Sequence, residues 1–399
     1  MTQSDLQALP IRESASGGGR AMAFDYLRSF GVLLVVLHHA VLAYVTFGFL
    51  NPENPVATFS PIVDGAKWAG FDRITMMNDT FFMPLLFLVS GLFVWHSLRS
   101  KDVDGFLLSR LKRLGIPFVF GLLVLTPLAY YPTVLEIQLV FGEGQSLGSF
   151  WLELLRSGFG TAGPLWFVWL LLIFDVIAAL LFGVFGKRRR AEGAPRERSW
   201  LLDNPVIFVL VLFGLSLAAY IPMTRAFGPT AWKGIGPLQV QISRVFLYLL
   251  YFLAGVVLGS RGLERGAFRR DGPIAKYWWA WVLAGIGSYA ALSWVFTSHP
   301  TSPLLVYVFL AEVALVVMAC VAVFVRFAGR GSRILNSLSR NSYGIYLLHY
   351  LVIVWLQYAV LRAKIAVGWK FAIVFVGGIA ICWAATAVLR RIPGVRRVI

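Results

Sequence analysis

The sequence predicts an all-α polytopic membrane protein with about ten transmembrane helices and both termini in the cytoplasm. Of its 399 residues, 58% are hydrophobic and only 14% are charged, whereas soluble domains average about 45–50% apolar and about 25% charged residues. A soluble fold of this size cannot bury that much apolar surface. Apolar runs of about 20 residues, the length that crosses the hydrocarbon core, recur along the chain. Each run is expected to be a helix, because a helix satisfies the hydrogen bonds of its own backbone within the lipid.

The hydrophobic pattern places the individual spans. Prolines interrupt two of them: Pro117, Pro127 and Pro132 lie in the third span, and Pro222 ends the fifth. The expected spans are 30–50, 80–98, 115–135, 164–186, 204–222, 238–259, 277–297, 303–326, 342–361 and 369–389.

Basic residues set the expected orientation. Most of the 36 lysines and arginines fall in alternate loops and at both ends, for example in the Arg-rich segment 187–200, and such loops face the cytoplasm. The net charge of +17 is therefore a topology signal, and no nucleic-acid partner is expected. We expect a cytoplasmic tail over 1–23, one transmembrane domain over 24–391 and a basic cytoplasmic C-terminus over 392–399. The first span is expected to be retained, since no small-residue cleavage site follows it.

No metal or permanently bound cofactor is expected. The two cysteines, Cys320 and Cys382, each lie within an apolar run and are interpreted as small buried hydrophobic residues. The chain contains neither a CxxC nor an HExxH spacing.

Several ionisable side chains fall within the expected spans, where charge is costly and indicates a functional site. In the first span, residues 11 apart share a helix face, so Arg28 and His39 line up, with Asp25 on nearly the same stripe. His39 lies roughly 16 Å deeper than Arg28, and His38 points about 100° away. A buried imidazole suits a general base, although a structural histidine between helices is the alternative. The ionisable candidates are His38, His39, Asp79, Asp175, Arg244, Glu312 and His349.

The entrance of the third span carries an arginine pair. Arg110 and Arg113 stand at i, i+3 and share a helix face, and two guanidiniums at a helix end can bind a phosphate. The alternative is a simple positive-inside cluster. If the pair binds phosphate, replacing both residues should weaken binding and leave the fold intact.

Taken in order, these motifs resemble the acyltransferase-3 family of membrane O-acyltransferases. The resemblance rests on Arg28 and His39 with ten residues between them, Arg110-x-x-Arg113, the Phe-rich segment 81–91, Leu165-Trp166-Phe167, and the segment 342–349 that ends at His349. It covers the whole chain. The Asp-x-Leu-Arg start and the short length most resemble the branch that modifies osmoregulated glucans.

The resemblance implies transfer of an acyl group, as in O-acetylation, from cytoplasmic acyl-CoA to a hydroxyl of an envelope glycan or lipid-linked acceptor at the bacterial inner membrane. His39, with Arg28 and Asp25, would be catalytic. Arg110, Arg113 and Trp166 would bind substrate, as would Glu312 and His349 unless these two form interhelical polar pairs. No Ser or Cys nucleophile motif such as GxSxG is present, so direct transfer is simpler than a covalent enzyme intermediate.

A proton-coupled transporter or flippase is the rival interpretation, because intramembrane Asp, Glu, His and Arg serve transport equally well. No internal repeat halves of the kind found in many transporters are visible. A sensor or scaffold has little support, since no soluble module is present. The acyl group, the acceptor and the oligomeric state stay open at this point.

Overall fold

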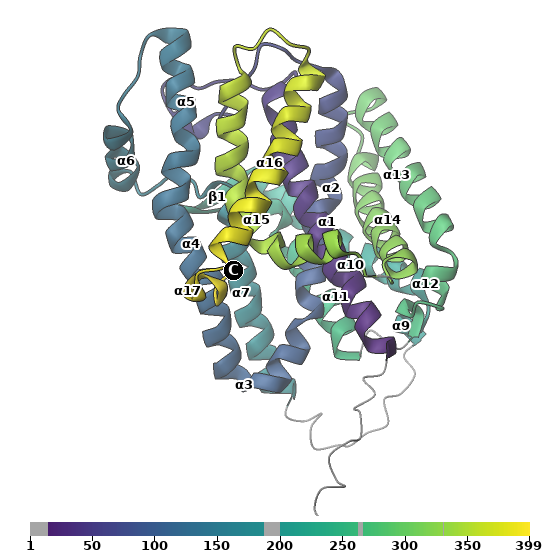
Figure 1. Cartoon of the computed structure of the whole chain (residues 1–399). Coiled ribbons are helices and arrows are strands. Elements are labelled where there is room, and N and C mark those ends of the chain that lie inside the picture. Colours follow the sequence, from purple (N-terminus) through teal and green to yellow (C-terminus); the bar gives the residue numbers. More distant parts are fainter. Residues whose placement is uncertain (1–14, 187–199, 262–265, 330) are drawn as a thin grey trace, which may run out of the picture.

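The computed structural model describes residues 15–186, 200–261, 266–329 and 331–399. Within them, ten helical segments are long and apolar enough to cross a membrane, which confirms the predicted all-α architecture and number of spans (Figure 1). An even number of spans returns the chain to its starting side. Residues 1–14 of the expected tail, and 187–199 of the expected Arg-rich loop, lie outside the described residues.

The spans connect through short helices and one hairpin. The hairpin pairs β1 (Trp232–Ile235) with β2 (Leu238–Gln241) in antiparallel register. The spanning elements are α1 (Ala15–Val41) with η1 (Leu42–Tyr44), α2 (Ala69–Leu92), α3 (Val94–Arg110) through α5 (Thr126–Phe141), η5 (Gly163–Leu165) with α7 (Trp166–Leu181), α10 (Pro205–Phe227), η7 (Ile242–Arg244) with α11 (Val245–Arg261), α13 (Trp278–Ser298), α14 (Leu304–Phe327), α15 (Arg333–Val360) and α16 (Val367–Leu389). The shorter helices are α6 (Leu147–Arg156), α9 (Trp200–Asp203), α12 (Pro273–Lys276) and α17 (Pro393–Arg396).

The first two spans begin earlier than predicted, at Met22 and Ala69 instead of residues 30 and 80. Hydropathy underestimates their first halves because it counts charged side chains as fully exposed. In α2, the carboxylate of Asp72 accepts hydrogen bonds from the backbone N–H and the hydroxyl of Thr46, at 2.8 and 2.6 Å. Such bonds lower the cost of placing a charge near the membrane. The predicted boundaries of these two spans were therefore wrong.

The third span is longer than predicted, because one helical segment of 48 residues runs from Val94 to Phe141. It bends at Asp102, whose φ is +60°, and it contains two π-helical turns, Leu111–Gly115 and Gly121–Leu125. These turns flank the stretch that contains Pro117 and precede Pro127. A proline removes one backbone N–H and crowds the preceding turn, and a π turn accommodates such a change in bonding without ending the helix.

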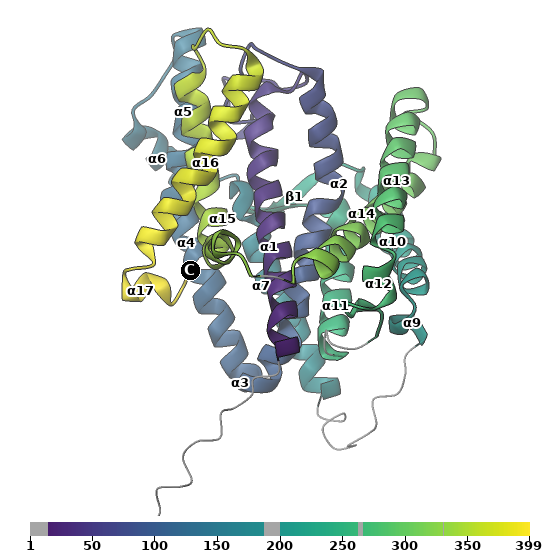
Figure 2. The same cartoon turned by 45° about the vertical axis from the view of Figure 1, so that its right-hand side comes forward.

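Helix α1 occupies the centre of the bundle. It packs against α15 and α16 on one side and against α2 and α14 on the other, as the turned view shows (Figure 2). Two hydrophobic cores meet along it. One includes Phe24 and Leu27 with side chains of α10 and α14, and the other includes Val32 and Val36 with side chains of α7 and α15. Residues on α1 can therefore face either half of the molecule.

Helices α2 and α11 approach one another closely through glycines. A Cβ atom on Gly255 would lie 2.0 Å from the backbone oxygen of Leu88, and one on Gly259 would lie 2.1 Å from that of Leu92. This pair has the small-xxx-small spacing that lets membrane helices bring their backbones together. Any larger side chain here would force the two helices apart.

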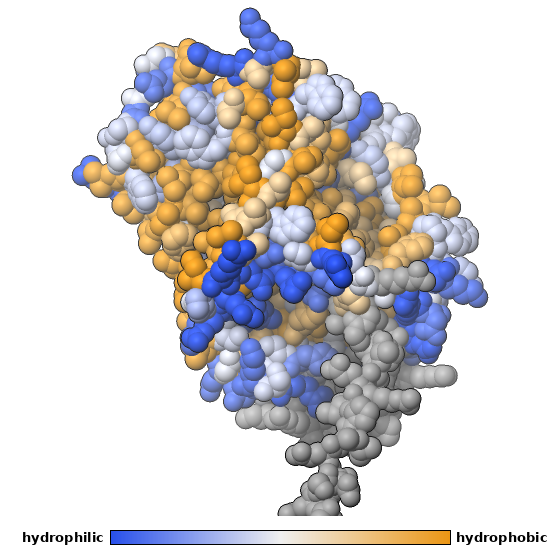
Figure 3. Space-filling view, viewed as in Figure 1, coloured by the Kyte–Doolittle hydropathy of each residue, from blue (hydrophilic) through white to orange (hydrophobic). Residues whose placement is uncertain are grey.

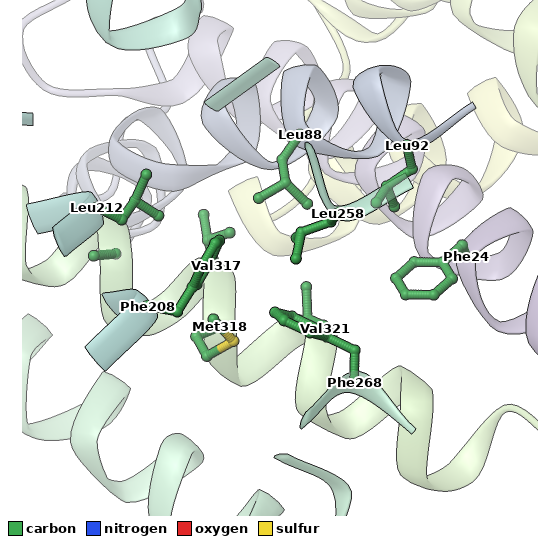
Figure 4. A pocket seen from close by; sticks show the side chains of 11 residues that line it. Phe24, Leu88, Leu92, Phe208, Leu212, Leu258, Phe268, Val317, Met318 and Val321 are labelled. Carbon is green, nitrogen blue, oxygen red and sulfur yellow. The ribbon is translucent and has the colours of Figure 1, made fainter. Parts of the chain in front are cut away.

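The surface divides into an apolar region and a polar region. Hydrophobic residues cover α5, α15 and α16 in the upper part of the view, and hydrophilic residues gather lower down, around α17 (Figure 3). Below the surface, one pocket between α1, α2, α10, α11 and α14 has an apolar lining that includes Phe24, Leu88, Met318 and Phe268 (Figure 4). No nitrogen or oxygen of these side chains faces it, so this pocket belongs to the core.

Candidate functional site

The two adjacent histidines of α1 face different helices. The His39 ring lies 5.2 Å from the His349 ring and 4.9 Å from the Tyr350 ring, centroid to centroid, and both partners belong to α15. The His38 ring instead stacks on Phe82 of α2 at 5.2 Å. The predicted rotation of about 100° between neighbouring residues therefore separates the two imidazoles onto the two halves of the bundle.

Backbone contact fixes the tautomer of His349. Its Nδ1 contacts the backbone carbonyl of Tyr346, and a carbonyl oxygen accepts only, so Nδ1 carries the proton and donates it. The Nε2 atom of the neutral ring is then the nitrogen with the free lone pair. This Nε2 is buried and has no hydrogen-bond partner among the described residues, and the same holds for Nδ1 of His39. Each of the paired rings thus has a buried nitrogen that the described residues leave without a hydrogen bond.

Two tyrosines close the space beside these histidines. The Tyr350 hydroxyl donates to the Tyr130 hydroxyl of α5 at 3.3 Å, and the Tyr346 hydroxyl donates to the backbone oxygen of Pro164. Gly163, with a φ of +52°, leaves room for them: a Cβ atom there would lie 3.3 Å from Cε1 of Tyr350. The segment before α7 is therefore packed against tyrosines that neighbour the histidine pair.

A glutamine on α15 fixes the end of α1. The last carbonyls of a helix lack intrahelical donors, and Gln357 supplies one by donating from Nε2 to the His39 carbonyl at 2.8 Å. Gln357 is almost fully buried. It anchors the backbone that carries the His39 ring to the helix that carries His349.

The sequence motifs did not identify Tyr130, Tyr350 or Gln357 as site residues. The only available signals were that Tyr350 follows His349 directly and that Gln357 is a polar residue inside an apolar span. Neither signal indicates a partner on another helix.

Arg28 and Asp25 form an ion pair at the opposite end of the stripe. Their side chains are 3.1 Å apart and both are more than a third exposed, so Asp25 and Arg28 share a helix face as predicted. Arg110 and Arg113 lie within electrostatic range of Arg28. Three guanidiniums therefore gather on the side predicted to be cytoplasmic, roughly 16 Å along α1 from His39. Asp25 and Arg28 are brought together with the arginine pair and not with the imidazole.

The two arginines of the pair have different environments. The Arg110 side chain lies 3.3 Å from the Asp175 carboxylate, which is 1% exposed, and it also lies over the Phe106 ring at 5.0 Å. Arg113 is exposed, and its backbone oxygen accepts a hydrogen bond from the Tyr343 hydroxyl at 2.6 Å. The expectation that both arginines can be replaced with the fold intact is therefore not supported for Arg110, because Arg110 neutralises a buried carboxylate of α7.

Glu312 and Trp166 have other neighbours than the paired histidines. Glu312 is fully buried in α14 beside Thr80 and within electrostatic range of Arg244 and Asp79. The Trp166 ring stacks on Tyr248 of α11 at 5.6 Å. The structure therefore brings His349 to His39, and it places Glu312 and Trp166 in another part of the bundle.

Metal ligands do not cluster in the described part of the chain, where no group of three or more His, Cys, Asp or Glu residues is arranged to hold an ion. Cys320 and Cys382 are both free, on α14 and α16. The described residues therefore offer paired imidazoles as the groups suited to proton transfer.

The fold and this site define a multi-pass membrane protein with a pair of histidines in contact between two of its helices. The model of a family described as an acyltransferase domain, the acyltransferase-3 family, matches residues 23–387. The chain belongs to that family and is a membrane acyltransferase. No curated protein and no solved structure matches it.

Proposed function

We propose that the protein transfers an acyl group from acyl-CoA, bound from the cytoplasm, to a hydroxyl of an envelope glycan or glycolipid at the bacterial inner membrane. The observation that carries the proposal is the arrangement along α1. Arginines gather at one end, and the His39–His349 pair lies about 16 Å further along the helix. Phosphates bind best to guanidinium groups, and coenzyme A carries several of them, so its thioester arm would extend from the arginines toward His39.

In this proposal His39 is the general base. It removes the proton from the acceptor hydroxyl, whose oxygen attacks the thioester carbonyl carbon. The carbon–sulfur bond breaks, the acyl group becomes an ester, and the protonated imidazole returns its proton to the coenzyme A thiolate. His349 and Tyr350 hold the His39 ring in place. Arg28, Arg110 and Arg113 bind donor phosphates, and Asp25 positions Arg28.

The resemblance to the glucan-modifying branch supports a glucan as one such acceptor. A transporter or flippase without acyl chemistry is not favoured, since the family match extends over nearly the whole chain. The two activities also differ in a direct measurement, because only an acyltransferase releases free coenzyme A.

The test separates donor binding from turnover in His39→Gln, which keeps a polar side chain that cannot take a proton. A positioned base contributes about 10²–10⁴-fold to rate, so acyl transfer should fall by that factor. Binding of acetyl-CoA to the purified protein should stay at the wild-type level, since the arginines are unchanged. Transfer is measured in cells by mass spectrometry of ester-linked acyl groups on periplasmic glycans and envelope lipids.

His38→Ala is the matched control, because His38 faces Phe82 and not His349. It should retain measurable transfer. Near wild-type modification by His39→Gln would show that His39 is structural and would reject the proposal.

A further inference from the structure

A second polar cluster lies within the bundle, on the His38 side of α1, and is centred on an ion pair. Nη2 of Arg244 lies 2.7 Å from the Asp79 carboxylate, and Nη1 donates to the Asp79 backbone oxygen at 2.8 Å. The two partners differ in exposure: the Arg244 side chain is 9% exposed and the Asp79 side chain 45%. Charged groups inside spanning helices face the bundle interior or a water-filled cavity and pair with one another. Pairing with Arg244 orients the Asp79 carboxylate, and part of the Asp79 side chain is left exposed.

Aromatic rings continue from this ion pair. Tyr248 lies one helical turn after Arg244, and its ring stacks on Trp166 at 5.6 Å. Trp232, on strand β1, meets Trp166 edge to face at 5.9 Å and is 48% exposed. Both cartoon views show the hairpin that carries Trp232 at mid-height of the molecule (Figures 1 and 2). These side chains thus form one row of contacts, with the half-exposed Asp79 carboxylate at one end, the half-exposed Trp232 ring at the other, and the buried Arg244 and Tyr248 side chains between them.

The exposed groups at the two ends of this row favour one class of ligand. Because Asp79 and Arg244 neutralise each other, the ion pair has no net attraction for a cation or an anion, yet the half-exposed Asp79 carboxylate offers a charged hydrogen-bond acceptor. The half-exposed Trp232 ring offers flat apolar area. A saccharide has both complementary features, since its hydroxyls form the edges of a ring whose faces carry C–H groups.

We infer that Asp79, Arg244, Trp166 and Trp232 form a saccharide subsite for the acyl acceptor. This inference rests on the proposed function and names the residues that would recognise its acceptor. The subsite is near the reaction centre: Asp79 and Arg244 lie within electrostatic range of His38, whose ring centroid is 5.5 Å from that of His39. An acceptor bound here would extend its hydroxyls toward the proposed base.

The test measures saccharide binding to the full-length protein in lipid nanodiscs, by calorimetry, with laminaripentaose, cellopentaose and maltopentaose as probes. Trp232→Ala should weaken binding at least about tenfold, the loss typical of an anchoring tryptophan. Trp232→Phe keeps an aromatic face and should bind within a few-fold of wild type. Trp294→Ala is the matched control, since Trp294 on α13 is similarly exposed, at 58%, and pairs with His299 instead.

Asp79→Asn provides a second measurement, since it keeps the size of the side chain and removes its charge. It should weaken binding as well. Unchanged saccharide binding in Trp232→Ala, or no saturable binding of any of the three probes to the wild-type protein, would overturn the subsite.

Acetyl-CoA binding, measured in the same samples, should be equal in the wild-type protein and all of these variants. Failure of the subsite would therefore leave the His39-dependent test of acyl transfer unaffected, and the two proposals can be rejected separately.

Discussion

Replacing Arg110 with Met should have two separable effects, because this arginine has two environments. Its guanidinium lies 3.3 Å from a carboxylate of Asp175 that is 1% exposed, while 22% of the Arg110 side chain is exposed on the arginine cluster. Removing one partner of a buried ion pair costs about 3–5 kcal/mol, because the other charge is left uncompensated. A lost charged hydrogen bond to a donor phosphate costs about 1.5–3 kcal/mol, or about 10- to 150-fold in affinity.

A double variant, Arg110→Met with Asp175→Leu, separates the two effects. An apolar pair of similar volume often matches a buried ion pair in stability, so the melting temperature in detergent should recover toward the wild-type value. Acetyl-CoA affinity, measured by calorimetry, should stay as low as in the single variant. Arg113→Ala should lose affinity without losing stability, since Arg113 is exposed.

Lys112→Ala is the matched control, because Lys112 is an exposed cation between the two arginines. It should leave both the melting temperature and the donor affinity near wild type. A double Arg110/Asp175 variant that is stable and binds acetyl-CoA as well as wild type would refute the donor role of Arg110. The pair would then serve only to stabilise the packing of α3 on α7.

Three further predictions concern the scaffold. Lys370→Met should lower the free energy of unfolding by about 3–5 kcal/mol, because Lys370 and Asp64 form a buried ion pair at 2.6 Å; a melting temperature equal to wild type would contradict this. Gly255→Leu should prevent accumulation of folded protein, measured by size-exclusion chromatography, whereas Gly287→Leu should not, since no atom lies within 4 Å of a Cβ there. Reporter fusions at Gly193 and at the C-terminus should both report cytoplasm, and a periplasmic signal from either would reject the topology.

Helical geometry within one element was predictable from the sequence, and contacts between elements were not. The spacing of Asp25, Arg28, His38 and His39 follows from 3.6 residues per turn, and the structure confirms both the Asp25–Arg28 pairing and the divergence of the histidines. The contact of His39 with His349 joins residues 310 positions apart. Nothing in the periodicity of either span indicates that α1 and α15 are neighbours.

Span boundaries were wrong where charges are paired by the fold. A hydropathy average assigns Asp72 and Asp79 the cost of free charges, although Thr46 and Arg244 bind them. The sequence likewise did not distinguish Arg110 from Arg113, because the ion pair between Arg110 and Asp175 is formed only when α3 packs on α7. Buried polar residues could be listed from the sequence, but their partners depend on which helices pack together.

The tandem histidines suggest how one helix can serve two substrates that enter from different sides. Consecutive residues of α1 point about 100° apart, so His39 reaches the His349–Tyr350 side, and His38 reaches the side of Asp79 and Arg244. The donor, held by arginines at the cytoplasmic end, and a saccharide, held beside Trp166 and Trp232, would then meet at the centre of the bundle. Because the two imidazoles lie on a single helix, the distance between them stays nearly constant when the surrounding helices move. The donor side and the acceptor side of the proposed reaction would therefore keep a fixed relation to α1.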